Sequence, residues 1–337
     1  MNKYSFLAAM ALVAMASCTN NEFEQEGPAV AASETPIVVK TGVATKASIG
    51  TGDNVTALFA LISAESAPEA SDWEAFSPRT ENKLADGTFA NYATDAANLS
   101  TGSFVANPTA QAISFQPTLY YNGTQDNNDK AYMVGVAPVG TVSGGTVTFA
   151  TKDGEQDILY AEQIDKGSKD SPDESATFKF EHMTGQVSFK VKKDETTLAS
   201  SLVTVKGITL KQVRLPKSIA LGDGKVTYDA QADLALPNVI SSQAVTEAGV
   251  ETGNPVMVAP MVTLSIDAVI TIDGKDKTYS NVPVTFTGTN GGTGITQGYS
   301  SEVTINVKQT TSTETAIEAS ASVAPWKTGN TGNVDLN

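Results

Sequence analysis

The chain has 337 residues, with 37 acidic residues against 22 Lys and Arg, so its formal net charge is −15. A chain this acidic does not bind nucleic acid or an anionic lipid surface through a general electrostatic field. It has one cysteine and one histidine, which excludes an internal disulfide and a zinc site built from several Cys and His ligands.

The first seventeen residues have the pattern of a secretory signal peptide. Lys3 supplies a positive charge, and the apolar run over residues 6–15 is too short for a permanent membrane-spanning helix. The run ends in Met15-Ala16-Ser17-Cys18, which resembles a bacterial lipobox with Met in the usual position of Leu.

In lipoprotein precursors of that kind, the signal peptide is cut before the cysteine and lipid is attached to its thiol. We therefore expect a signal peptide at residues 1–17, cleavage between Ser17 and Cys18, and acyl chains such as palmitate on Cys18. Several acyl chains give stable membrane anchoring, whereas one is marginal. The alternative is an ordinary signal peptide followed by a free cysteine.

Residues 18–35 are polar and are expected to form a linker or tether. Glu22, Glu24 and Glu26 follow the cysteine closely. This resembles the acidic export signal that sends some lipoproteins of Bacteroidetes to the cell surface, and a flexible charged tether is the competing interpretation.

Strand patterns begin after Pro36. Ile37, Val39, Thr41 and Val43 fall on one face, and this period of two predicts a half-buried strand. An apolar strand over 55–62 follows, and then an insertion over 65–101 with one short helix. Further strands are predicted over residues 112–115, 131–137, 146–149 and 158–160.

Residues 165–175 contain no apolar side chain, so a domain boundary is predicted there. This gives an N-terminal domain over residues 36–172 and a C-terminal domain over residues 173–337.

In the second domain, apolar and polar residues alternate clearly, with apolar residues at Val187, Phe189 and Val191. Asp273-Gly274 separates two strand patterns and predicts a two-residue hairpin turn. The remaining strands are predicted over residues 203–210, 225–228, 255–259, 262–272, 282–287 and 301–307. Short, regularly spaced strands predict an all-β protein made of β-sandwiches.

No residue pattern singles out a catalytic centre. His182 is the one available base for a Ser-His-Asp triad, but its place at a strand start favours a packed or capping residue. Paired carboxylates could serve a hydrolase, although no motif selects a pair. We expect no enzyme activity, cofactor or metal site.

Three weaker patterns have structural interpretations. Gly291-Gly292-Thr293-Gly294 lacks the lysine and helix of a phosphate loop and predicts a turn. Asp126-Asn127-Asn128-Asp129 lacks the EF-hand order of calcium ligands. The aromatic residues able to stack on sugars are explained equally well by core packing; these are Trp73, Tyr92, Tyr120 and Tyr121.

Several stretches together resemble the fimbrillin family of Bacteroidales, the pilins of type V pili. After the lipoprotein signal, an extended strand over 37–43 ends in Ala44-Thr45-Lys46-Ala47, where family members often carry a Thr-Arg-Ala-like site. The other resembling stretches, in chain order, are Tyr132 to Pro138, Phe178 to His182 running into Val187 to Val191, Gly298-Tyr299, and Val323-Ala324-Pro325-Trp326 followed by Gly329 to Leu336.

The resemblance implies two tandem transthyretin-like β-sandwich domains. It also implies that a protease removes the first strand, here at Lys46-Ala47, and that a strand from another subunit then occupies the vacated groove. The family's processing enzyme is typically Arg-specific, whereas this site offers Lys46. The donor segment is expected over about 312–337, with alternating Ile317, Ala319, Ala321 and Val323.

The expected function is therefore that of a structural and adhesive pilus subunit at the surface of the outer membrane and in the extracellular fimbrium. Expected partners are other fimbrial subunits in a homo- or hetero-polymer, the membrane through Cys18, and a ligand on a host or bacterial surface. The alternatives are a surface glycan-binding lipoprotein and a tip or anchor subunit that does not polymerise.

Overall fold

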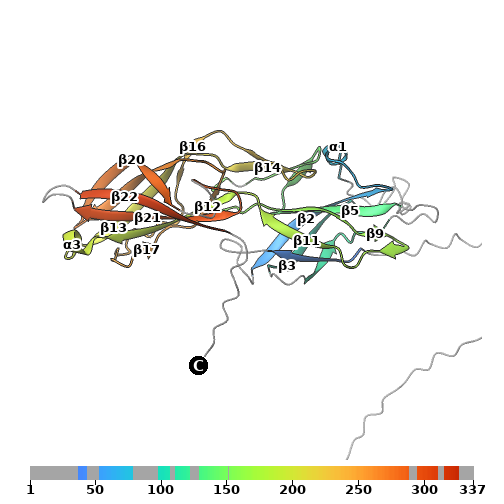
Figure 1. Cartoon of the computed structure of the whole chain (residues 1–337), viewed down its shortest axis with the longest axis horizontal. Helices are drawn as coiled ribbons and strands as arrows, with labels where there is room; N and C mark the ends of the chain where they lie inside the picture. The colour runs from blue at the N-terminus through green and yellow to red at the C-terminus, as the bar shows by residue number, and fades with distance from the viewer. Residues whose placement is uncertain are drawn as a thin grey trace, which may run out of the picture. The chain divides into compact units, whose positions relative to one another are not determined.

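The structure is a computed structural model that describes residues 37–43, 53–78, 98–106, 111–121, 129–150, 152–287, 294–309 and 315–325 (Figure 1). The predicted signal peptide, lipidation site, tether and processing site lie outside these residues. Strands make up most of the described residues, and the helices among them are two short segments, so the all-β prediction is confirmed.

Seven strands between residues 39 and 182 close into a barrel with the order β1-β11-β8-β5-β2-β3-β4. The ring closes because β1 pairs in parallel with β11 and antiparallel with β4. The strands are β1 (Val39–Val43), β2 (Asn54–Ala64), β3 (Leu99–Val105), β4 (Gln111–Gln116), β5 (Lys130–Ala137), β8 (Leu159–Asp165) and β11 (Thr177–His182).

Aromatic rings fill the inside of this barrel. Phe59 of β2 lies at the centre, with its ring centroid 5.2 Å from those of both Phe115 and Phe178. Phe104 stacks on Phe180, again with 5.2 Å between ring centroids. Such pairs contribute about 0.5–1.5 kcal/mol each beyond the area they bury, so the barrel has a dense internal core.

A second apolar cluster covers the outer face of strands β2, β5 and β8. Trp73, from the short helix α1 (Ala70–Glu74), is buried there and donates its indole Nε1–H to Gln163 Oε1 at 2.7 Å. Ile219 and Val147 join this cluster from a separate sheet. That sheet contains β6 (Thr141–Ser143), β7 (Thr146–Thr148), β14 (Pro216–Ala220) and β15 (Val226–Tyr228).

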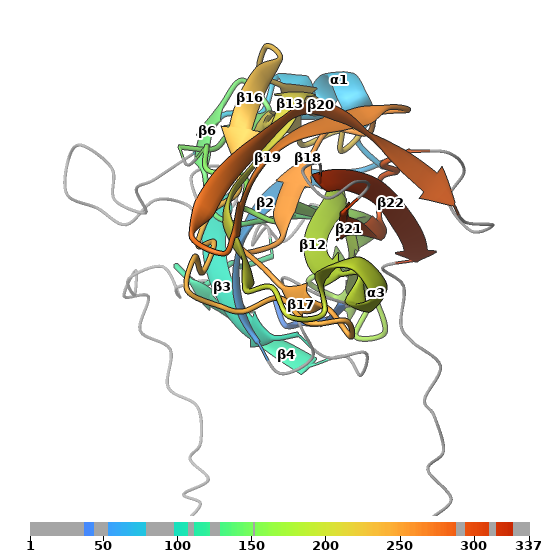
Figure 2. The same ribbon diagram turned by 90° about the vertical axis from the view of Figure 1, so that its left-hand side faces the viewer.

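Nine strands between residues 185 and 325 form a further sheet, in which β22 lies between β20 and β21 (Figure 2). The main path is β16-β13-β19-β20-β22-β21-β12-β17, and β18 pairs with β12. The strands are β12 (Gly185–Lys193), β13 (Val203–Val213), β16 (Ala232–Ala235), β17 (Val250–Glu251), β18 (Val256–Val258), β19 (Leu264–Ile272), β20 (Lys275–Thr287), β21 (Tyr299–Gln309) and β22 (Thr315–Pro325).

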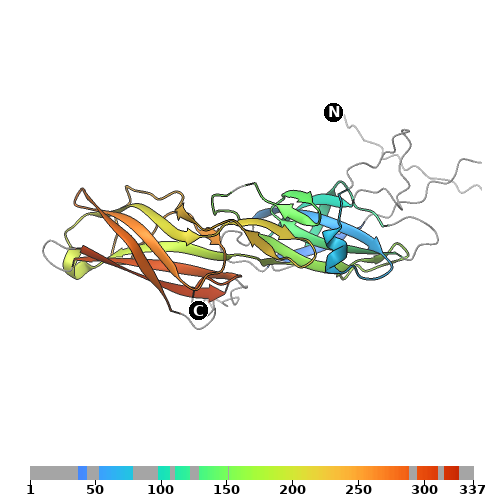
Figure 3. The same ribbon diagram turned by 90° about the horizontal axis from the view of Figure 1, so that it is seen from above.

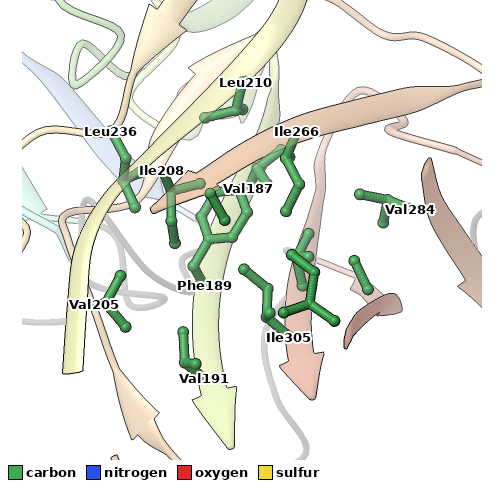
Figure 4. Close-up of a cluster of buried hydrophobic side chains, with 14 of the residues drawn as sticks. Val187, Phe189, Val191, Val205, Ile208, Leu210, Leu236, Ile266, Val284 and Ile305 are labelled. Atoms are coloured by element: carbon green, nitrogen blue, oxygen red, sulfur yellow. The ribbon is translucent and has the colours of Figure 1, made fainter. Parts of the chain in front are cut away.

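The predicted alternation in β12 is confirmed. Val187, Phe189 and Val191 are buried and lie beside Ile305 of β21 and Ile266 of β19 (Figure 4). Because successive side chains of a strand point to opposite faces, this spacing places one face of β12 in the core. A second short helix, α3 (Glu195–Leu198), follows β12, and no helix within the described ranges is long and apolar enough to cross a bilayer.

Strands β19 and β20 form the hairpin predicted from Asp273-Gly274 (Figure 3). Both turn residues have positive φ, +48° for Asp273 and +79° for Gly274. Two consecutive positive φ values are the signature of the type I′ turn, which matches the right-handed twist of paired strands.

Gly274→Ala is expected to lower the free energy of unfolding by about 1 kcal/mol, because a Cβ disfavours positive φ. The added Cβ would meet nothing within 4 Å, so the loss comes from the backbone alone. Gly207→Ala is the control, since its Cβ is equally free of contacts and its φ is not in the positive region. Urea unfolding of both variants measures the difference, and an equal effect in both would contradict this explanation.

Candidate functional site

The candidate site is the position of β1 between two strands from distant parts of the chain. We call it the β1 slot, bounded by residues 111–113 of β4 and 177–180 of β11. On the β4 side, Val39 lies opposite Ile113. On the β11 side, Thr41 lies opposite Phe178. Backbone pairing on both edges makes β1 the strand that closes the barrel.

The side chains of this segment alternate as the sequence predicted. Ile37, Val39 and Thr41 are buried, with exposed fractions of 3%, 0% and 1%. Val38, between the first two, is 61% exposed. The backbone N–H of Ile37 donates to Leu119 O at 2.8 Å, which holds the chain just before β1.

Ile37 and Val39 belong to the same buried cluster as Phe59, Phe178 and Phe180. Burying an aliphatic side chain of this size contributes about 1.5–3 kcal/mol. Without β1, the slot would present apolar side chains and the unpaired backbone groups of β4 and β11. Such an edge is a ready template for another strand.

Small residues leave room for the aromatic core below the slot. A Cβ on Gly135 of β5 would lie 2.7 Å from the Phe180 ring and 3.2 Å from the Phe59 ring. Real Cβ atoms essentially never approach another atom as closely as 2.7 Å, so a side chain at this position would displace the Phe180 ring. The shape of the slot therefore depends on strands that never touch β1 directly in the sheet.

The predicted donor residues lie in β22 of the second sheet. Ile317, Ala319, Ala321 and Val323 all fall within this strand, which pairs antiparallel with β21 from Thr315 to Pro325. Ile317 and Ala319 are buried in the core of the second sheet. β22 also pairs in parallel with β20 over four residues, 319–322. Donation of this strand to another subunit therefore requires its release from its own sheet.

The other predicted site residues, Ser17, Cys18, Lys46 and Ala47, lie outside the described residues, as do Tyr92, residues 126–128 and residues 291–293. Two of the aromatic residues considered for sugar stacking, Trp73 and Tyr121, are buried, which confirms core packing for them.

His182 is a packed residue, as its sequence position predicted. It is 5% exposed, and its Nδ1 lies 3.0 Å from Oδ1 of Asp157, which is also buried. The backbone N–H of Met183 donates to Ile158 O at 2.8 Å and fixes the end of β11 beside β8. This environment supports a structural role for the single histidine.

The sequence did not reveal the buried lysine in the polar segment 165–175. Lys166 is 1% exposed, and its Nζ donates to the carbonyl oxygens of Asp173 and Ala176. The Tyr121 hydroxyl donates to Lys166 O at 2.8 Å. Burial lowers the pKa of Lys166 below its usual value. Within this segment β9 (Gly167–Ser168) and β10 (Ser171–Pro172) form a small hairpin.

The boundary predicted at residues 172–173 remains a prediction. Strand β11, which follows that position, pairs with β1 and β8 of the barrel. Strand β14, further along the chain, pairs with β7. Strand β11 thus belongs to the barrel and β14 to the sheet that contains β7. The sequence pattern alone did not indicate these pairings.

The described residues therefore define an all-β protein in which β1 closes a barrel of seven strands. Residues 78–326 match the family described as fimbrillin-like, and the chain therefore belongs to that family. None of the curated protein sequences matches the chain.

One solved structure with a TM-score above 0.5 has the same fold, and two others are similar at lower scores. The chain resembles a candidate cell adhesion protein from Bacteroides uniformis ATCC 8492, with a TM-score of 0.52 and 13% identity over 87% of this chain and 99% of that one. A fimbrial protein from Bacteroides vulgatus ATCC 8482 gives a TM-score of 0.49 and 13% identity over 86% and 99%. The tip fimbrial protein Mfa3 from Porphyromonas gingivalis, with a C-terminal truncation, gives 0.41 and 7% over 87% and 100%.

Proposed function

We propose that the chain is a fimbrial subunit with a structural and adhesive role, exported as an outer-membrane lipoprotein through Cys18. A protease cuts after Lys46, the segment carrying β1 leaves, and a strand from another subunit fills the β1 slot. The support for this proposal is family membership together with the fimbrial and adhesion descriptions of the similar structures.

The observation that carries strand exchange is the double pairing of β1. It bonds to β4 on one edge and to β11 on the other, and it buries alternate side chains in the barrel core. Lys46 follows three residues after the end of β1. A cut there breaks the covalent link between β1 and the rest of the barrel. Only noncovalent contacts then hold β1 in place, so another strand can replace it.

The incoming strand is proposed to be β22 of a neighbouring subunit, through Ile317, Ala319, Ala321 and Val323. Its apolar residues recur at every second position, which matches the alternation in the slot. Because donor and slot are different surfaces, each subunit could donate to the next, and such a heterologous contact extends into an open filament.

The first test is limited tryptic digestion of the lipid-free chain, with sequencing of the new N-terminus and electrophoresis of unboiled samples. Wild type and Lys46→Arg are expected to start at Ala47 and to form a ladder of stable multimers. Lys46→Ala is expected to remain uncut at this site and monomeric.

Multimers that form equally well from Lys46→Ala would contradict the processing site. A wild-type chain that is cut at Ala47 but stays monomeric would contradict polymerisation and would favour a tip or anchor subunit.

A further inference from the structure

We propose that Thr41 makes β1 a displaceable occupant of its slot, and that the slot selects an incoming strand with an aliphatic residue at the Thr41 position. This inference rests on the proposed strand exchange and adds a residue that determines which strand the slot prefers.

Thr41 occupies the third inward position of the β1 segment, after Ile37 and Val39. It is 1% exposed, and its hydroxyl Oγ1 is buried without a hydrogen-bond partner among the described residues. Burying a hydroxyl group unpaired loses its hydrogen bonds to water without replacement. Valine has nearly the same shape and carries no such penalty, so threonine weakens the hold of the slot on β1.

Two buried hydroxyl groups of the barrel region are paired, whereas the other buried hydroxyls without a hydrogen-bond partner among the described residues lie outside the barrel strands, at Thr184, Thr252 and Ser301. Ser100 of β3 is also buried, and its hydroxyl donates to Pro117 O at 2.6 Å. The buried hydroxyl of Tyr121 donates to Lys166 O at 2.8 Å. Hydroxyl groups on these permanent parts of the barrel are thus paired, whereas the one on the strand proposed to leave is not.

Lys40 of β1 and the buried Lys166 carry like charges and repel each other. The positive charge of Lys40, on the exposed face of β1, helps to lower the pKa of buried Lys166, although burial is the larger cause. Asp173 and Glu174 act on Lys166 in the opposite sense. The repulsion between Lys40 and Lys166 is therefore a secondary contribution, and its loss accompanies the departure of β1.

The proposed donor meets the requirement that β1 fails. Ile317, Ala319, Ala321 and Val323 place an aliphatic side chain at every second position, with no hydroxyl among these four. A register that places any of these four residues at the Thr41 position therefore brings an aliphatic side chain there. The exchange replaces an unpaired buried hydroxyl with an apolar group, which favours the donor over β1.

Hydrogen–deuterium exchange of the uncut, lipid-free chain tests this directly, because amide exchange in β1 reports its local opening. Thr41→Val is expected to slow exchange of the β1 amides by about fivefold or more. Thr41→Ser keeps the hydroxyl and is the matched control, with no slowing expected. Amides of β3 serve as the internal reference.

Unchanged or faster β1 exchange in Thr41→Val would overturn the inference. The measurement needs no polymerisation, so it fails independently of the proposed function. After cutting at Lys46, Thr41→Val is expected to form multimers about fivefold more slowly than wild type. Equal rates, despite slowed β1 exchange, would contradict the proposal that Thr41 makes β1 easier to displace.

Discussion

A disulfide between β21 and β22 is expected to abolish assembly of the cut subunit. Thr304 of β21 lies directly opposite Ser320 of β22, and both side chains are only partly buried. Directly opposite residues of antiparallel strands have Cβ atoms about 4.5–5.5 Å apart, within reach of a disulfide after a small adjustment. The double variant Thr304→Cys/Ser320→Cys would therefore hold β22 in its own sheet.

The physical reason lies in the two competing positions of β22. It is paired with β21 over eleven residues and with β20 over four, and it must leave both strands to fill another subunit's slot. The disulfide makes this release impossible without unfolding β21 as well. Reduction of the same sample is expected to restore assembly, so each preparation contains its own control.

The experiment uses a chain from which Cys18 has been removed, so that the two introduced residues are its only cysteines. Multimers are scored by unboiled electrophoresis after cutting at Lys46, with and without reductant. Each single-cysteine variant controls for the substitutions. Equal assembly in the oxidised and reduced samples would show that β22 is not the donor.

Val39→Asp is expected to expel β1 from the slot without any proteolysis. Val39 is fully buried at 0% exposure, and an unpaired carboxylate there would cost several kcal/mol. The amides of β1 are then expected to exchange faster with solvent deuterium. The vacant slot is expected to bind donor strands of other chains, although no chain has been cut.

Val38→Asp is the matched control, since Val38 is the neighbouring residue and is 61% exposed. It introduces the same charge one position away and is expected to behave as wild type. Light scattering and unboiled electrophoresis of uncut protein measure the difference. If hydrogen exchange shows that Val39→Asp has released β1 and this variant still forms no multimers, a vacant slot is not what triggers assembly.

The sequence predicted the local structure well where one face of a strand is buried. The alternation of Ile37, Val39 and Thr41 and that of β12 followed from the period of two. The hairpin turn followed from Asp273-Gly274, because this pair readily adopts the positive φ values that a type I′ turn needs.

Long-range pairing was beyond the sequence pattern. Nothing local indicates that β1 pairs with both β4 and β11, or that β14 pairs with β7. Strand periodicity fixes which side chains face inward, but the choice of partner depends on contacts far apart in the chain. The predicted donor residues were recognised as a strand, whereas their place between β20 and β21 was not.

The buried polar groups were also missed. A lysine in a run without apolar residues predicts a solvated loop, yet Lys166 is buried because nearby backbone carbonyls accept its hydrogen bonds. Thr41 alternates correctly with its apolar neighbours, and only the structure shows that its hydroxyl has no partner among the described residues.

The central claim is that the β1 slot of one subunit is filled by β22 of another. Cross-linking mass spectrometry of multimers made from mixed ¹⁵N-labelled and unlabelled chains tests it most directly, because a mixed-label pair must come from two subunits. The account predicts mixed-label cross-links from residues 315–325 to β4 and β11. Multimers in which residues 315–325 cross-link to β20 and β21 of their own chain, and β1 stays in its slot, would contradict it.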